Sequence, residues 1–133
     1  MKKSILVGSS SFSIKSINVL KRKTRNKYKI IINDKKRKLT DSELLEIFKK
    51  DKICGSIAGL ENYNKSIINR SGLKVISRVG SGISNIDLNT AKLKKIKVLS
   101  TPLAPVDSVA ELTLSMMIQL LRSTEQMNMK LKK

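Results

Sequence analysis

Two closely spaced glycines, Gly80 and Gly82, stand where the sequence passes from a β-type run into the start of a helix. The segment reads Arg-Val-Gly-Ser-Gly-Ile-Ser-Asn-Ile-Asp over residues 78–87. Open α/β sheets bind ligands beyond the carboxyl ends of their strands, and glycines there let backbone N–H groups approach an anion closely. A helix N-terminus also favours negative charge. The spacing therefore indicates either a carboxylate or phosphate site made of backbone donors, or an ordinary tight turn.

Other chemistry has few candidate residues. The chain has no histidine and a single cysteine, Cys54, so neither a Ser-His nor a Cys-His pair can form, and no internal disulfide. We expect no metal site, because no cluster of ligand residues has a suitable spacing. The Gly80-Ser81-Gly82 run is not the dinucleotide fingerprint G-x-G-x-x-G, since Asn85 stands where the third glycine would be.

The elements that must position this loop alternate between short β-type runs and helical segments. Thr40 followed by Glu43 has the spacing of a capping box at a helix start. The rhythm indicates βαβ units, and therefore a flavodoxin-like, doubly wound, parallel five-stranded sheet of the α/β class. Strands are expected at 4–7, 28–32, 53–58, 73–77 and 96–99, with helices at 12–20, from 40, at 64–69 and at 87–94.

The sequence changes character after Pro102. A long helix is expected over residues 106–123, capped by Asp107 or Ser108. Its apolar residues occupy more than one face, so we expect it to contact two partners or to self-associate. Residues 124–133 are polar and are expected to be frayed.

The composition bounds the function further. A net charge of +18 raises the question of nucleic acid, and residues 21–38 hold ten basic residues against one acid. Lysines dominate and are widely spread, which favours a compositional origin and a solvated surface over nucleic-acid binding. No apolar stretch approaches a membrane span, and no signal peptide is apparent. We therefore expect a soluble, cytoplasmic protein without a membrane partner.

Residues 73–121 resemble the N-terminal half of the NAD-dependent D-2-hydroxyacid dehydrogenases, the phosphoglycerate dehydrogenase-like family. The loop 78–87 matches the family's pattern of arginine, two glycines and Asn-Ile-Asp, and Ser-Val-Ala-Glu at 108–111 matches the opening of its long helix. The resemblance implies that residues 1–103 form the substrate-binding domain. It implies that residues 104–133 form the linking helix and the start of an NAD-binding domain.

Site residues carry over from the family by position. The resemblance implies that Ser81 and Gly82 bind the substrate carboxylate, that Val79 and Gly80 shape the turn, and that Ser81 also borders the nicotinamide of NAD. Arg78 is either an anion clamp or a member of a structural ion pair.

The chain departs from the family at three places. Ser84 replaces a usual aspartate, and Pro105 replaces an asparagine that lines the site in many members. The run 57–61 lacks the arginine with which phosphoglycerate dehydrogenases grip their substrate, which argues against 3-phosphoglycerate itself.

The expected function of the intact enzyme is hydride transfer between NAD(H) and C2 of a small 2-hydroxy or 2-oxo acid. The family's catalytic histidine, its carboxylate and its G-x-G-x-x-G turn are expected beyond residue 133, so we expect this chain alone to show no turnover. A truncated product, a split enzyme completed by a second chain, a homodimer and a stand-alone remnant stay open. So does a non-catalytic module that binds a small carboxylate or, through its basic surface, nucleic acid. NAD and NADP are not distinguished.

Overall fold

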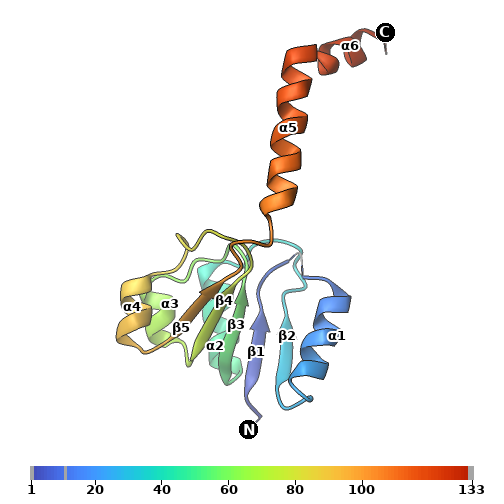
Figure 1. The fold of residues 1–133 in the computed structure, drawn as a ribbon. Helices are drawn as coiled ribbons and strands as arrows, with labels where there is room; N and C mark the ends of the chain where they lie inside the picture. The colour runs from blue at the N-terminus through green and yellow to red at the C-terminus, as the bar shows by residue number, and fades with distance from the viewer. Residues whose placement is uncertain (1, 11, 132–133) are drawn as a thin grey trace. The chain divides into compact units, whose positions relative to one another are not determined.

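The computed structural model describes residues 2–10 and 12–131, and the chain divides into two compact units, Met1–Thr101 and Pro102–Lys133. The first unit holds five strands and four helices (Figure 1). In chain order its elements are β1 (Ser4–Val7), α1 (Ile14–Lys23), β2 (Lys29–Ile32), α2 (Asp41–Lys50), β3 (Ile53–Ala58), α3 (Lys65–Arg70), β4 (Val75–Arg78), α4 (Leu88–Leu93) and β5 (Lys97–Ser100). The second unit holds α5 (Val106–Arg122) and α6 (Thr124–Leu131).

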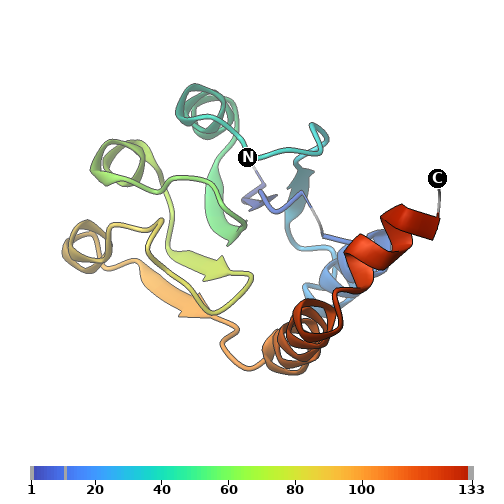
Figure 2. The ribbon, with the colours of Figure 1, turned by 90° about the horizontal axis from the view of Figure 1, so that it is seen from above.

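The five strands form one parallel sheet in the order β2-β1-β3-β4-β5. The order reverses between β1 and β3, so the crossover helices lie on both faces, as right-handed connections require. Figure 2 shows α2, α3 and α4 in a row on one face and α1 on the other. The predicted α/β fold, with a doubly wound sheet of five strands, is therefore confirmed.

The core lies between the sheet and the row of three helices. Leu6, Ile76 and Val98 share one row across the sheet, and Leu6 and Ile76 are fully buried. They pack with Leu44 of α2 and with the buried isoleucines of α3. Apolar burial on this face supplies most of the stabilisation of the unit.

Within the described part of the first unit, α1 is the helix that covers the opposite face of the sheet, which is only half-buried. Ile5, Gly55 and Val75 form its central row, and Leu99 on the edge strand is 45% exposed. A shallow groove of about 240 Å³ runs between this row and Leu20 of α1. The two faces of the sheet are therefore unequally packed.

Helix starts in the first unit follow the capping residues of the sequence. Thr40 and Glu43 form the predicted capping box, in which each side chain accepts a bond from the other residue's backbone N–H. Asn64 and Asp87 cap α3 and α4. The expected helix 12–20 instead begins at Ile14, because the hydroxyl of Ser13 accepts the N–H of Ser16 as an N-cap.

The second unit corrects two expectations. α5 has Pro105 as its N-cap residue, without a side-chain cap, so Asp107 and Ser108 already lie in its first turn. The expected frayed end, residues 124–133, is instead the helix α6 over Thr124–Leu131, and residues 132–133 lie outside the described residues. Ser123 separates the two helices in a left-handed conformation, with φ 50°. Polarity was a poor guide here, since the residues of α6 include good helix formers such as Glu, Gln, Met and Lys. Within the described ranges of the chain, no helix is long and apolar enough to cross a bilayer.

Glu43 also pairs with the basic stretch. Its carboxylate accepts two bonds from the guanidinium of Arg37, at 2.8 and 3.0 Å, and one from the ammonium of Lys35. Lys29 pairs with Asp51 at 2.7 Å. Three of the ten basic residues in 21–38 are therefore engaged with acids of the same chain, which fits the reading of this stretch as a solvated surface.

Acid should abolish the contribution of Glu43 to stability. Bonds from Arg37, then from Lys35 and the Thr40 N–H, hold the pKa of the Glu43 carboxyl well below its usual range. A lowered folded-state pKa stabilises the fold above the unfolded-state value, and this stabilisation is lost as the pH falls through the folded-state value. We expect Glu43→Gln to lower the urea midpoint at neutral pH and the deficit to shrink progressively in acid. The exposed Glu46, whose contact with Lys50 is 3.9 Å, provides the matched control, and an equal pH dependence for Glu46→Gln would contradict the assignment.

Candidate functional site at the carboxyl edge of the sheet

The glycine loop begins where β4 ends and is tied to both neighbouring strands. The N–H of Val79 donates to the carbonyl of Ala58 at 2.9 Å and so extends the pairing with β3. Gly80 donates its N–H to Oγ1 of Thr101 at 2.8 Å and accepts the N–H of Thr101 at 3.0 Å. The backbone donors of Val79 and Gly80 are therefore already used by the fold.

Gly80 makes the turn that redirects the chain. Its φ is +121°, a conformation that residues with a Cβ rarely adopt. A Cβ at this position would also lie 2.7 Å from Nη1 of Arg78, so the guanidinium packs against the bare Cα of the glycine. The predicted role of Gly80 in shaping the turn thus has both a conformational and a steric basis.

Ser81 and Gly82 follow this turn and are exposed. Unlike Val79 and Gly80, their N–H groups have no hydrogen-bond partner among the described residues. No heavy atom lies within 4 Å of the position that a Cβ of Gly82 would take. Two adjacent backbone donors are therefore open to an incoming acceptor.

The second half of the loop is anchored on the segment that follows β3. The side-chain amide of Asn85 donates to the carbonyls of Gly59, at 3.2 Å, and Glu61, at 2.6 Å. Tyr63 donates its N–H to the carbonyl of Asn85 and accepts the N–H of Asp87, at 2.8 and 2.9 Å. This short parallel bridge holds the glycine loop against its neighbour.

Each residue of the Asn-Ile-Asp motif therefore has a structural role. Asn85 joins two loops, and Ile86 is 5% exposed and belongs to the core. Asp87 caps α4 by accepting both the N–H and the hydroxyl of Thr90, and these bonds lower the pKa of its carboxyl. Ser84, which stands where the family usually has an aspartate, is exposed and leaves these bonds intact.

Glu61 fills the crevice where the strand order reverses, a position that was not predicted. Its side chain is 1% exposed, and its Oε2 accepts the N–H of Gly59 at 2.6 Å. A Cβ at Gly8, at the end of β1, would lie 3.0 Å from this carboxylate. Flavodoxin-like folds bind phosphate-bearing cofactors at this crevice, and a buried carboxylate excludes one here. The sequence signal that could have indicated this burial is the presence of Gly8 and Gly59 after two strands, since both leave room for the Glu61 side chain.

Burial also makes the neighbouring Tyr63 a structural residue. Its hydroxyl lies 2.6 Å from that of Ser56, and burial raises the pKa of the phenol above its ordinary value. Tyr63 is therefore a neutral hydrogen-bonding partner of the core, with no role as an acid or base.

Arg78 lies at the end of β4 in an unusual state. Its Nε is buried without a hydrogen-bond partner, and no ion pair or hydrogen bond involves its guanidinium among the described residues. The alternative of a structural ion pair for Arg78 is therefore wrong for this part of the chain. An unpaired buried donor costs about 1–3 kcal/mol. An acceptor from outside the described fold would therefore stabilise this guanidinium.

The segment 101–111 spans the boundary between the two units. Thr101 completes the Gly80 turn, whereas Pro105 and Glu111 belong to the second unit. Glu111 is exposed on α5, and no hydrogen bond or ion pair involves its side chain within the described residues.

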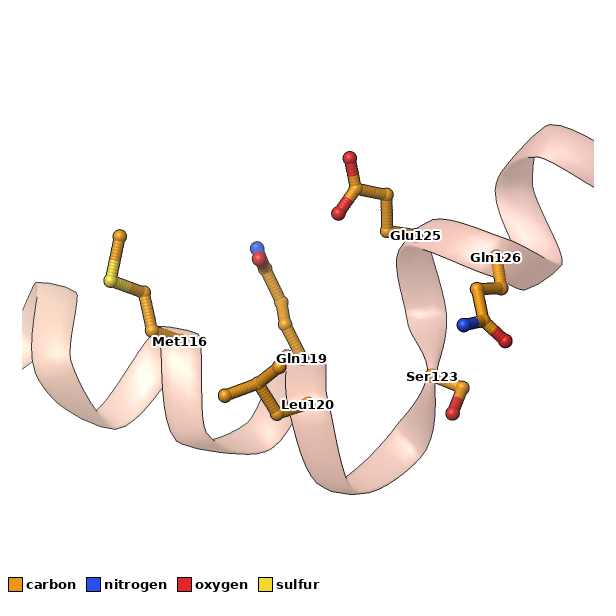
Figure 3. A pocket seen from close by; sticks show the side chains of 6 residues that line it. All are labelled: Met116, Gln119, Leu120, Ser123, Glu125 and Gln126. Atoms are coloured by element: carbon orange, nitrogen blue, oxygen red, sulfur yellow. The ribbon is translucent and has the colours of Figure 1, made fainter.

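A hollow of about 330 Å³ lies in the bend between α5 and α6. Figure 3 shows Met116, Gln119 and Glu125 extending to the same side of the two helices. Among its lining residues are one carboxylate, Glu125, and one hydroxyl, Ser123, but no basic side chain that could activate the hydroxyl or pair with the carboxylate. None of the predicted site residues belongs to this unit, and no metal-ligand cluster occurs in residues 2–10 and 12–131.

The fold and the loop together define a class: a doubly wound α/β domain with two open backbone N–H groups beyond the carboxyl end of β4. The sequence profile described as D-isomer specific 2-hydroxyacid dehydrogenase, catalytic domain, matches residues 7–131. The chain belongs to this oxidoreductase family.

Individual relatives agree with this assignment. The hydroxypyruvate reductase of Thermotoga maritima is 47% identical over 60 residues, which cover 45% of this chain and 20% of that protein. The D-3-phosphoglycerate dehydrogenase of Methanocaldococcus jannaschii is 38% identical over 95 residues, 71% of this chain and 18% of that protein. The crystal structure of NAD+-bound 3-phosphoglycerate dehydrogenase from Entamoeba histolytica superimposes with a TM-score of 0.74 at 26% identity, covering 89% of this chain and 38% of that one. The matched segments therefore cover about a fifth of the length of the Thermotoga and Methanocaldococcus proteins.

Proposed function

We propose that this chain binds the carboxylate of a small 2-hydroxy or 2-oxo acid through the N–H groups of Ser81 and Gly82. The observation that carries the proposal is the contrast within one loop. The backbone N–H groups of Val79 and Gly80 form hydrogen bonds within the fold. The N–H groups of the next two residues are exposed and have no partner among the described residues. Oriented backbone N–H groups of this kind form anion-binding concavities.

The role in the intact enzyme follows from the family. Residues 1–103 would be the substrate-binding domain, and 104–133 the linking helix and the beginning of an NAD-binding domain. The carboxylate held by Ser81 and Gly82 would fix the orientation of C2, the carbon that exchanges a hydride. Positioning of this kind is a large part of catalysis, because it removes the entropic cost of bringing the reacting atoms together.

The residues of this chain do not by themselves form a dinucleotide site. Glu61 occupies the crevice at the reversal of strand order, and no third glycine follows Gly82 at position 85. Ser81 is the one residue proposed to border the nicotinamide, through its exposed side chain. NAD supplies the hydride chemistry in the family, and we assign no step of it to residues 2–131.

The test uses a stable substrate analogue. Oxamate carries a carboxylate next to a carbonyl and is not a substrate for reduction. In the ¹⁵N-labelled 133-residue chain we expect oxamate to shift the amide resonances of Ser81 and Gly82, while its neutral methyl ester does not. Equal shifts with both ligands, or shifts confined to residues outside 79–87, would overturn the proposal.

Gly82→Val separates binding from folding. Gly82 has open space around the site of a Cβ and its φ is not positive, so the substitution should leave the free energy of unfolding within about 0.5 kcal/mol of wild type. An isopropyl group over the N–H of residue 82 should still abolish the oxamate-induced shifts. Gly80→Ala is the matched contrast, since its strained φ should cost about 1–3 kcal/mol of stability. Unchanged oxamate binding by Gly82→Val would exclude this backbone as the carboxylate site.

A further inference from the structure

The unpaired arginine beside the glycine loop has a consequence for ligand binding. The guanidinium of Arg78 packs on the Cα of Gly80, the residue directly before Ser81, with Nη1 2.7 Å from the position of a missing Cβ. The side chain is half-buried, and its Nε is buried without an acceptor. A guanidinium is charged at all accessible pH values and has five N–H donors in a planar fork.

Three neighbouring residues thus present donors that the described fold does not use. Arg78 contributes the guanidinium, and Ser81 and Gly82 contribute their backbone N–H groups. The N–H of Gly80, which lies between them in the chain, is held by Thr101. One anion placed over the turn would provide acceptors for the guanidinium and for both backbone donors.

We propose that Arg78 is a substrate-binding residue that supplies the positive charge of this carboxylate site. The inference rests on the proposed function, because it assigns a second set of donors to the same ligand. The fork of the guanidinium matches the two oxygens of a carboxylate, and charge-assisted hydrogen bonds are roughly twice as strong as neutral ones. The ligand class is therefore a carboxylate acid, and uncharged carbonyl compounds are excluded.

The close packing of Arg78 on Gly80 adds a reason for glycine at position 80. A side chain there would push the guanidinium away from its place over the turn. Gly80 in this reading positions the charge as well as the chain, and Arg78 and Gly80 form one unit.

The experiment compares three arginine variants in the full 133-residue chain. Oxamate affinity is measured from the chemical shifts of the Ser81 and Gly82 amides in wild type, Arg78→Gln, Arg78→Lys and Arg70→Gln. Arg70 is exposed at the end of α3, so Arg70→Gln removes the same unit of charge away from the loop. We expect Arg78→Gln to weaken binding about tenfold or more, which is about 1.4 kcal/mol. Arg78→Lys should recover part of the loss, and Arg70→Gln should bind as wild type does.

The outcomes separate this inference from the proposed function. Wild-type binding together with unchanged binding by Arg78→Gln overturns the role of Arg78 and leaves the backbone site standing. Equal losses in Arg78→Gln and Arg70→Gln also overturn it, because the effect is then one of net charge. Failure of wild type to bind oxamate at Ser81 and Gly82 removes the proposed function and this inference with it. A purely structural role would show as shifted Gly80 and Thr101 amides in ligand-free Arg78→Gln, without rescue by lysine.

Discussion

Asn85→Ala is expected to lower the free energy of unfolding of the Met1–Thr101 unit by about 2 kcal/mol and to abolish oxamate binding. The amide of Asn85 donates to the carbonyls of Gly59 and Glu61, so its removal leaves two acceptors of an adjacent loop without a donor. Each lost bond contributes about 1 kcal/mol, and more where the abandoned carbonyl is buried. The loop that holds Ser81 and Gly82 would then lose its side-chain anchor.

Tyrosine fluorescence gives a clean measurement of this effect. The chain has two tyrosines and no tryptophan, and both Tyr28 and Tyr63 lie in the first unit. Tyr63 forms the bridge to Ile86 and donates its N–H to the carbonyl of Asn85, so urea unfolding followed through its emission reports on the loop that Asn85 anchors. The helices of the second unit do not contribute to this signal.

Asn89→Ala is the matched control. Asn89 is exposed on α4, four residues along the chain from Asn85. We expect its stability to stay within about 0.5 kcal/mol of wild type, since its side chain is at the surface. Similar destabilisation by the two substitutions, or retained oxamate binding in Asn85→Ala, would show that the amide does not hold the loop.

The fold was accessible from the sequence because its signals are local and mutually consistent. The capping pair Thr40 and Glu43 fixed the start of α2, and the alternating apolar runs located all five strands to within two residues. Parallel pairing followed from the helix between each pair of strands. The strand order depended on the fold type that the rhythm and the resemblance both indicated, because no local pattern encodes which strands become neighbours.

The misses have definite physical causes. α1 starts two residues later than expected because Ser13 provides a cap that the apolar pattern obscured. Of the apolar residues in α1, Ile17 is buried and Ile14 is 77% exposed. A helix that covers only one end of a sheet face buries less of its apolar surface than its periodicity suggests.

The proposed site was likewise predictable only in part. The loop itself was apparent from Gly80, Gly82 and the helix start that follows them. The contacts that decide which donors are free were not, since the bond from Gly80 to Thr101 joins residues 21 positions apart. The burial of Glu61 at the strand reversal likewise depends on Gly8, which is more than fifty residues away in the sequence.

These long-range contacts explain why the open backbone donors, and with them the proposed site, lie beyond β4 and not at the strand reversal. A doubly wound sheet offers a crevice between β1 and β3, but here the side chain of Glu61 fills it. The donors that stay open belong to the next loop, where Asn85 and Thr101 fix the backbone from either side. The site is therefore held by neighbours on both strands, which suits a rigid recognition element.

Leu6→Ala is expected to produce the largest loss of stability, about 2–5 kcal/mol. Leu6 is fully buried on the interior strand β1 and belongs to the core cluster between the sheet and its helices, where its removal leaves a cavity. Leu99→Ala makes the same change on the opposite face of the edge strand β5, where the side chain is 45% exposed, and should cost less than about 1 kcal/mol. Tyrosine-monitored urea unfolding of both variants measures the difference. We expect unequal losses of unfolding free energy because the two faces of the sheet are unequally covered. Equal losses for Leu6→Ala and Leu99→Ala would mean that the face on the α1 side is as well packed as the core, and would contradict the packing argued from the exposed fraction of Leu99.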